Sequence, residues 1–177
     1  MLEYVSEGIV LNREPSGELD VRVSIFTKKF GKLLAKAKSA RKITSKLSAH
    51  LEPGNLIQAR LVEKKGLQVA DALKLGRAEI NSPDLYFLDK LLALAEPDLK
   101  LWNLLIRGRF EWMEALKLLG WDREHSRCEL CGSRAPEIFL MTTQEFVCEK
   151  CAFEGRGGAR PAKEDMLHLR EKDKINQ

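Results

Sequence analysis

Apolar and polar side chains alternate along residues 2–72 with a period of two, which is typical of β-strands. Residues 19–27 show this most clearly, because every second position from Leu19 to Ile25 is apolar. Glu14-Pro15-Ser16-Gly17 and Lys64-Lys65-Gly66 carry the residue types of turns between strands. We predict five strands, over residues 2–12, 19–27, 32–38, 55–63 and 67–72.

The spacing of apolar residues changes between the third and fourth strands. From Ile43 to Leu51 they lie four positions apart, so residues 42–52 are predicted to form a short helix that ends at Pro53-Gly54. An order of three strands, one helix and two strands is that of the five-stranded OB-fold barrel, whose open face commonly binds nucleic acid. We therefore expect residues 1–78 to be an OB-fold nucleic-acid-binding domain.

Residues 79–177 are predicted to be a small helical domain, which makes the fold class α+β. One helix begins near Ser82, a capping residue, and ends at Pro97; a longer helical stretch follows, broken at Gly108 and ended by Gly120. Large side chains on these helices are expected to pack in a core: Leu85, Leu88, Leu91, Leu92, Ala95, Trp102, Trp112, Met113 and Trp121.

All four cysteines lie in two Cys-x-x-Cys pairs, Cys128 with Cys131 and Cys148 with Cys151, separated by sixteen residues. This spacing is typical of a zinc ribbon, here over residues 126–153, with one tetrahedral Zn²⁺. Because four thiolates leave no position open to water, the zinc is expected to be structural. A redox dithiol is the alternative, but two such pairs together favour the metal.

Residues next to the predicted ribbon allow three further predictions. His125 lies three residues before the first cysteine pair and is expected to stay outside the metal site, because the cysteines already complete the set of ligands. Gly155-Arg156-Gly157-Gly158 is predicted to be a linker or turn, and residues 163–173 a last short helix.

The cysteine pattern and the composition together predict a location in the cell. Paired metal-binding thiols are typical of a reducing interior. The N-terminus lacks the pattern of a signal peptide, and no apolar run is long enough to cross a bilayer. We therefore expect a cytoplasmic protein with no membrane partner.

Positive charge gathers in the N-terminal half, although the net charge is only +4. Residues 1–80 hold 15 Lys and Arg against 9 Asp and Glu, whereas residues 81–177 hold 15 against 17. Residues 28–46 carry eight cations and no acid, a pattern that indicates binding to a polyanion. These candidate DNA-binding residues are Lys28, Lys29, Lys32, Lys36, Lys38, Arg41, Lys42 and Lys46.

The alternation in the third strand predicts that Lys32, Lys36 and Lys38 lie on one face and contact phosphates. A solvated surface without a ligand is the alternative interpretation of the same run. Phe30 is a candidate to stack on bases, whereas Phe26 ends an apolar strand and is expected in the core.

The sequence does not favour an enzyme. It lacks a phosphate-binding glycine loop of the P-loop type and an H-E-x-x-H motif, and its histidines, His50, His125 and His168, lie far apart. We therefore predict no catalytic residues and no cofactor other than Zn²⁺.

Two segments resemble the bacterial recombination mediator family RecO. The first is Leu19 to Lys46, centred on Ile25-Phe26-Thr27-Lys28-Lys29-Phe30-Gly31-Lys32, and the second is Phe110 to Trp121, followed by the first cysteine pair. The resemblance implies a non-enzymatic protein that binds single- and double-stranded DNA and anneals complementary strands. It also implies that the protein works with RecR to load RecA on strands coated by single-stranded DNA-binding protein.

Known members of the family continue for several helices beyond the ribbon, whereas this chain ends at Gln177. The difference concerns the pocket of the helical domain that, by the resemblance, receives the tail of single-stranded DNA-binding protein.

Two other functions fit the same residues. An RNA- or ribosome-associated module of an OB-fold and a zinc ribbon would use the same basic surface, and a preference for RNA would favour it. A protein-docking adaptor would instead use the helices with their tryptophans, and would bind RecR even after DNA binding is lost.

Overall fold

The computed structural model describes residues 2–154 and 161–169. The chain forms two compact units, Met1–Phe110 and Glu111–Gln177. The expected OB-fold segment, residues 1–78, lies within the first unit, but so do the next two helices, so this division differs from the boundary expected near residue 78. The predicted linker, 155–158, lies outside the described residues.

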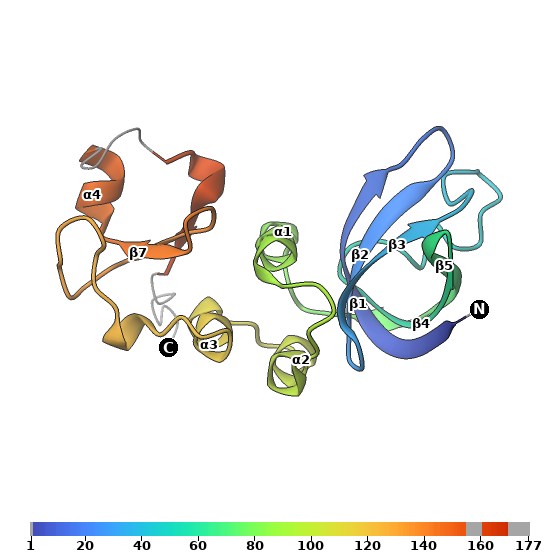
Figure 1. Cartoon of the computed structure of the whole chain (residues 1–177), viewed down its shortest axis with the longest axis horizontal. Coiled ribbons are helices and arrows are strands. Elements are labelled where there is room, and N and C mark those ends of the chain that lie inside the picture. Colours follow the sequence, from blue (N-terminus) through green and yellow to red (C-terminus); the bar gives the residue numbers. More distant parts are fainter. Residues whose placement is uncertain (1, 155–160, 170–177) are drawn as a thin grey trace, which may run out of the picture. The chain divides into compact units, whose positions relative to one another are not determined.

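Five strands form a barrel in the first unit (Figure 1): β1 (Glu3–Pro15), β2 (Val21–Thr27), β3 (Gly31–Ala37), β4 (Asn55–Lys64) and β5 (Gly66–Arg77). Their order around the barrel is β1-β2-β3-β5-β4, and β4 pairs with β1 to complete the circuit. All pairs are antiparallel except β3 with β5, which meet in parallel only at Lys36 and Gln68. The predicted five-stranded OB-fold barrel is confirmed.

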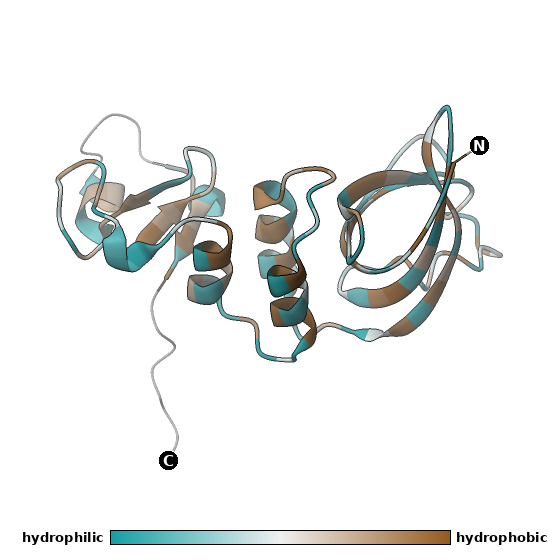
Figure 2. Ribbon diagram, turned by 60° about the horizontal axis from the view of Figure 1, so that its bottom comes forward, coloured by the Kyte–Doolittle hydropathy of each residue, from teal (hydrophilic) through white to brown (hydrophobic). Residues whose placement is uncertain are grey.

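The alternation of side chains along the strands produces the barrel core. In Figure 2, brown and teal bands alternate along the barrel strands, as this pattern requires. In β3, Ala35 and Ala37 point inward and are buried with Val23 and Ile25 of β2, while Lys36 and Lys38 are exposed. The sequence therefore predicted correctly which side chains of β3 enter the core.

The helix predicted over residues 42–52 is absent, and the segment is a series of turns. Its amides bond to oxygens three or four positions back, as in His50 N to Leu47 O. The Asn55 side chain binds the oxygens of Ala49 and His50, at 3.0 and 3.1 Å, which competes with helical bonding. Leu51 and Leu47 pack on the barrel core, but Ile43 is exposed, so the predicted apolar stripe does not form.

Two helices follow the barrel within the first unit: α1 (Ser82–Leu91) and α2 (Leu99–Ile106). Asn81, rather than the expected Ser82, caps α1 by accepting a hydrogen bond from Asp84 N at 2.8 Å. The helix ends at Leu91, well before Pro97, because the backbone becomes extended at Leu92, with φ −71° and ψ 128°. Ala95, at a positive φ of 57°, is exposed and leaves the predicted stripe.

Helix α2 attaches to the outside of the barrel through Trp102. This side chain is buried, and its ring lies 6.4 Å from that of Phe26 on β2. Asp98 caps the helix by accepting hydrogen bonds from Lys100 N and Leu101 N. The predictions that Trp102 and Phe26 are core residues are confirmed.

The second unit contains α3 (Trp112–Leu118), the 3₁₀ turn η1 (Arg123–His125), β6 (Ile138–Leu140), β7 (Glu145–Val147), α4 (Glu149–Glu154), η2 (Lys163–Asp165) and β8 (Met166–His168). The predicted helix break at Gly108 and end at Gly120 are confirmed, and both glycines have a positive φ, of 82° and 100°. Trp112, Met113 and Trp121 are half-buried rather than fully buried.

The helix predicted over residues 163–173 is wrong for the residues that the structure describes. A single 3₁₀ turn there leads into β8, which pairs with β6 in a three-stranded sheet ordered β7-β6-β8. Met166 and Leu167 are buried in this sheet, and pairing with β6 outweighs the local helical pattern. Among the described residues, no helix has the length and apolar character needed to cross a membrane.

Candidate metal centre and nucleic-acid interface

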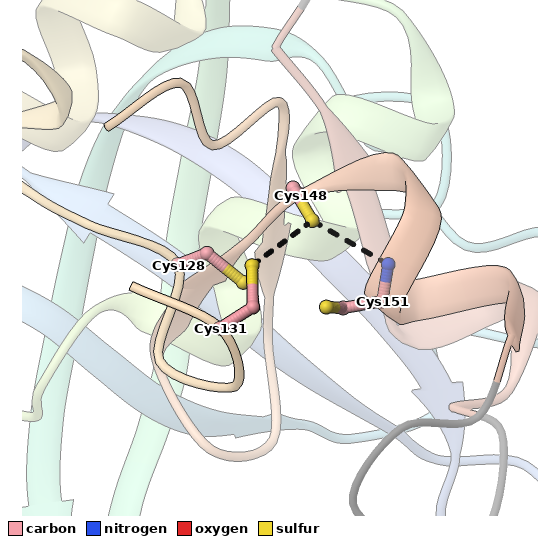
Figure 3. Close-up of side chains that lie close together, drawn as sticks. All are labelled: Cys128, Cys131, Cys148 and Cys151. Carbon is pink, nitrogen blue, oxygen red and sulfur yellow. Dashed lines mark hydrogen bonds between the residues drawn. The ribbon is translucent and has the colours of Figure 1, made fainter. Parts of the chain in front are cut away.

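The four cysteines of the second unit converge on one point. Figure 3 shows their sulfur atoms turned toward one another, with Cys128 and Cys131 on a loop and Cys148 and Cys151 at the start of α4. All four Sγ atoms lie within 4.8 Å of one another, and those of Cys131 and Cys148 are 3.7 Å apart. The predicted grouping of residues 128, 131, 148 and 151 is therefore what the fold produces.

Two local turns position the thiols. Cys128 N donates to Ser133 O, and Gly132 N, at a φ of 72°, donates to Cys128 O, so the first pair is held in a tight knuckle. In the second pair, Cys151 N lies 3.4 Å from Cys148 Sγ at the start of α4. Glu129 N bonds to Phe146 O, which ties the first knuckle to β7.

The cluster fits a tetrahedral metal ion. A zinc–sulfur bond of about 2.3 Å in a tetrahedron places neighbouring sulfurs about 3.8 Å apart, close to the 3.7 Å between Cys131 and Cys148. Among the metal ions that are common in structural sites, zinc is the one that four thiolates in a tetrahedron typically bind. A zinc ion there would have four protein ligands and would hold the two knuckles together.

The acidities of the thiols also favour a cation. Burial opposes ionisation of Cys128, but main-chain N–H groups of Cys148, Cys131 and Leu130 donate to its sulfur and lower its pKa to about 7. At Cys151, burial and hydrogen bonds with the other three thiols raise the pKa to about 12. One negative charge therefore forms readily and further charges do not, unless a divalent cation offsets them.

His125 stays outside this cluster, as expected. Its side chain is 82% exposed, and its Nδ1 lies 3.1 Å from Asp122 Oδ2. His50 has a separate, local role, because its Nδ1 accepts a hydrogen bond from Lys74 N at 3.1 Å. His168 stacks on Phe153, with ring centroids 6.4 Å apart.

In the first unit, the basic run of residues 28–46 is divided by Lys32. This side chain is only 11% exposed, beneath α1, where its Nζ donates to the main-chain oxygens of Asp89 and Leu92. It also lies 3.3 Å from Asp89 Oδ1. Lys32 therefore joins α1 to the barrel, and its place among the predicted phosphate contacts is corrected.

Beyond Lys32, the cations at the end of β3 and on the turns after it are exposed. Arg22 of β2 joins them, because it pairs with Lys36 across the two strands and is also exposed. Arg41 is held to the β1–β2 turn by a hydrogen bond of 3.3 Å from its Nη1 to Gly17 O. We call this set the basic surface: Arg22, Lys36, Lys38, Arg41, Lys42 and Lys46.

Arg22 was not among the predicted contacts, although the sequence contained the necessary signal. It lies at an outward position in the alternation of residues 19–27, and a hairpin between that strand and the next places it beside the outward lysines.

One acid lies within the basic surface. Asp20 Oδ2 is 2.9 Å from Lys36 Nζ, and Asp20 Oδ1 accepts a hydrogen bond from Ser39 N at 2.7 Å. The bond to Lys36, then that to Ser39, lowers the pKa of the Asp20 carboxyl, so it is ionised at neutral pH. Asp20 therefore offsets part of the charge of Lys36.

The first three candidates of the run lie at the opposite end of β3. Lys28 and Lys29 are exposed on the β2–β3 turn, and Lys28 Nζ lies 3.3 Å from Glu7 Oε2. The Phe30 ring is half-buried and meets the ring of Tyr4 edge-on, with centroids 5.2 Å apart. At about 3.3 Å per residue, the six steps along β3 from Gly31 to Ala37 separate the two ends of the strand by about 20 Å.

Comparisons with known proteins agree with this architecture. Residues 1–77 match the family model "Recombination protein O N terminal". The DNA repair protein RecO of Thermodesulfovibrio yellowstonii is 29% identical over 180 residues, which cover 85% of this chain and 71% of that protein. The RecO of Bifidobacterium longum is 27% identical, over 82% of this chain and 73% of that protein. The RecO of a Nocardioides species is 25% identical, over 94% and 80% respectively.

An OB-fold barrel joined to a four-cysteine ribbon is the architecture of a binding module with a candidate metal centre. The family model matches the barrel, and across most of its length the chain is similar to the DNA repair protein RecO of several bacteria.

Proposed function

We propose that the chain binds DNA through its basic surface, anneals complementary strands and, with RecR, promotes loading of RecA on strands coated by single-stranded DNA-binding protein. The observation that carries the first step is the group of six exposed cations of the basic surface, with Arg22 on β2 and the others at the end of β3 and on the turns after it. The names of the relatives carry the link to DNA repair. RecR, RecA and single-stranded DNA-binding protein are partners that the family resemblance suggests.

Binding through this surface is electrostatic. Lysine and arginine side chains that contact phosphates release counterions from the DNA, so affinity falls steeply as salt rises. Six such contacts predict a loss of about a thousandfold on duplex DNA between about 50 and 200 mM salt, and a smaller loss on single strands. Phosphate contacts position the strand and carry no sequence information, which suits a protein that acts at any sequence.

Annealing follows from the same charge. Two complementary strands repel each other through their phosphates, and a cationic surface that neutralises part of that charge lowers the cost of bringing them together. Lys28, Lys29 and Phe30, at the other end of β3, are a separate group that we propose as a second contact for DNA. Neither step requires a reaction at the protein, so we propose no enzymatic activity.

The test is to remove two cations from the basic surface. We expect the Lys38→Ala, Arg41→Ala double variant to bind duplex DNA more weakly and to show a log–log salt slope smaller by about 1.8, because each phosphate contact contributes about 0.9. The control is Lys100→Ala, an exposed cation on α2. Fluorescence polarisation over a salt series measures the slope, and strand annealing is followed in parallel.

An unchanged slope and unchanged annealing in the double variant contradict the proposal. Tighter binding of wild-type protein to RNA than to DNA of the same sequence would instead favour the RNA- or ribosome-associated function.

The opposite change in charge is expected to strengthen binding. In Asp20→Asn the amide oxygen can still accept the hydrogen bond from Ser39 N, but the carboxylate no longer offsets Lys36. We expect duplex affinity to rise by about threefold to tenfold at low salt, and the gain to shrink as salt screens the charges. The same titrations measure it, and an affinity equal to or below that of the wild type would show that Lys36 does not contact phosphate.

A further inference from the structure

A groove of about 250 Å³ lies in the first unit between α1 and the outer faces of β1, β2 and β3. Asn12 and Ser24 line it from the strands, Leu34 from β3, and Asp89 and Lys90 from α1. Drug-sized ligands occupy pockets of about 300–1,000 Å³. The groove therefore suits a smaller group, such as one nucleobase, and excludes a duplex.

The floor of the groove is polar and fixed. Ser24 is 4% exposed, and its Oγ has no hydrogen-bond partner among the described residues. Both oxygens of Asp89 have partners, since Asn12 Nδ2 donates to Oδ2 at 3.3 Å and Lys32 Nζ lies 3.3 Å from Oδ1. A buried polar atom without a partner costs about 1–3 kcal/mol, so Ser24 Oγ gains from a ligand that offers a hydrogen bond.

One wall of the groove is apolar and is continuous with the basic surface. Leu34 is 43% exposed and lies directly opposite Ser24 in the β2–β3 pair. Two residues further along the same pair, Arg22 lies opposite Lys36, and Arg22 also lines the groove. A strand whose phosphates contact the basic surface therefore passes the mouth of the groove.

We propose that this groove receives one unstacked base of a single DNA strand. The face of the base packs against Leu34, and its polar edge bonds to Ser24 at the floor, while the flanking phosphates contact Arg22 and Lys36. Recognition of splayed bases by packing on their faces and hydrogen bonds to their edges is common for single strands. Bases in a duplex are paired and stacked, so the groove distinguishes single strands from duplexes.

This inference rests on the proposed DNA binding. The position of the positive charge favours a DNA strand over an acidic peptide. The groove itself holds acids as well as cations, since Glu14 and Asp89 line it with Arg22, Lys32 and Lys90. The excess of positive charge lies beside the groove, on the basic surface that would contact the DNA backbone, rather than within the groove.

The experiment compares three probes of equal length: a single strand, the same strand with abasic sites throughout, and a duplex. Wild-type protein is expected to bind the ordinary strand about fivefold to tenfold more tightly than the abasic strand, because about one net hydrogen bond and the packing on Leu34 are lost. Leu34→Gln should bind both strands equally, with duplex affinity unchanged. The matched control is Leu73→Gln, which removes an exposed leucine from β5 outside the groove.

A 2-aminopurine in the strand reports the base directly, since its fluorescence rises when it leaves the stack; we expect that rise with wild-type protein and not with Leu34→Gln. Equal wild-type affinity for ordinary and abasic strands, or wild-type behaviour in Leu34→Gln, overturns the inference. Competition by an acidic peptide that Leu34→Gln abolishes, with no preference for the ordinary strand, would assign the groove to a peptide. Failure of every DNA probe to bind would instead overturn the proposed function.

Discussion

Lys32 and Lys36 lie four positions apart on the same face of β3, yet their surroundings differ. Lys36 is exposed beside Asp20, whereas Lys32 is covered by α1 and bonds to Asp89 and Leu92. The alternation of residues 32–38 correctly placed both on the outer face. It could not show that a helix about sixty residues later covers one of them, because that contact is not encoded in the period of the strand.

The structural role of Lys32 leads to a prediction at the scale of one residue. Lys32→Met leaves Asp89 buried without its partner, and we expect the free energy of unfolding to fall by about 3 kcal/mol. Affinity of the folded variant for duplex DNA should stay at the wild-type value, because α1 covers most of Lys32 and a duplex does not enter the groove that Lys32 lines. Thermal unfolding followed by circular dichroism, together with duplex titrations, measures both.

The control for this variant is the pair Lys32→Met, Asp89→Leu. An apolar pair of similar volume removes the unpaired charge, so it should be more stable than Lys32→Met alone. If Lys32→Met is as stable as the wild type but loses duplex affinity, Lys32 belongs with the phosphate contacts after all.

At the scale of the elements, the start of β3 is where α1 and α2 are joined to the barrel. Ala95 N donates to Lys32 O at 2.9 Å, and Leu94 pairs with Lys32 as a short parallel bridge. At Gly31, where φ is 68°, a Cβ atom would lie 2.3 Å from the main-chain carbon of Glu96. Only a glycine allows the chain between the two helices to approach the strand this closely.

Gly31→Ala is therefore expected to destabilise the protein by about 3 kcal/mol, from the positive φ and from the collision with Glu96. Gly66→Ala is the matched control, because its φ is 94° and a Cβ there meets nothing within 4 Å. It should cost only about 1 kcal/mol. Denaturant unfolding measures the loss of stability in each variant, and the difference between the two losses is the cost of the collision. Equal losses would mean that residues 94–96 do not pack on Gly31.

The elements that the sequence misassigned share a cause. Residues 42–52 have a helical spacing of apolar side chains, and residues 163–169 a helical composition, but neither forms an α-helix. In each case a partner outside the segment takes up some of its hydrogen bonds: Asn55, three residues after the first segment, and β6, more than twenty residues before the second. Short segments have too few local bonds to resist such partners.

At the scale of the whole molecule, the two units differ in what holds them together. The barrel of the first unit has its own core of buried side chains from all five strands. In the second unit, Cys128 and Cys151 are themselves part of the small core, with Ile138, Val147 and Met166. Because the thiols form part of this cluster, a metal ion bound by them would stabilise the packing around it.

Removal of the metal should therefore affect the units unequally. We expect a strong chelator, or Cys131→Ser, to remove hydrogen-exchange protection from β6, β7 and α4, while the barrel strands keep theirs. Elemental analysis before chelation identifies the ion, and exchange measured by mass spectrometry follows both units in one sample. Protection of β6 that survives complete removal of the metal would show that the ribbon does not depend on it.

The sequence alone determined the five barrel strands, the breaks at Gly108 and Gly120 and the grouping of the four cysteines, because period, backbone freedom and ligand spacing are local properties of the chain. The tertiary structure decided which lysines reach solvent and that a groove with a polar floor opens beside Leu34. Those features depend on which distant segments are packed against β2 and β3, and packing between segments has no signature in the order of residues within either one.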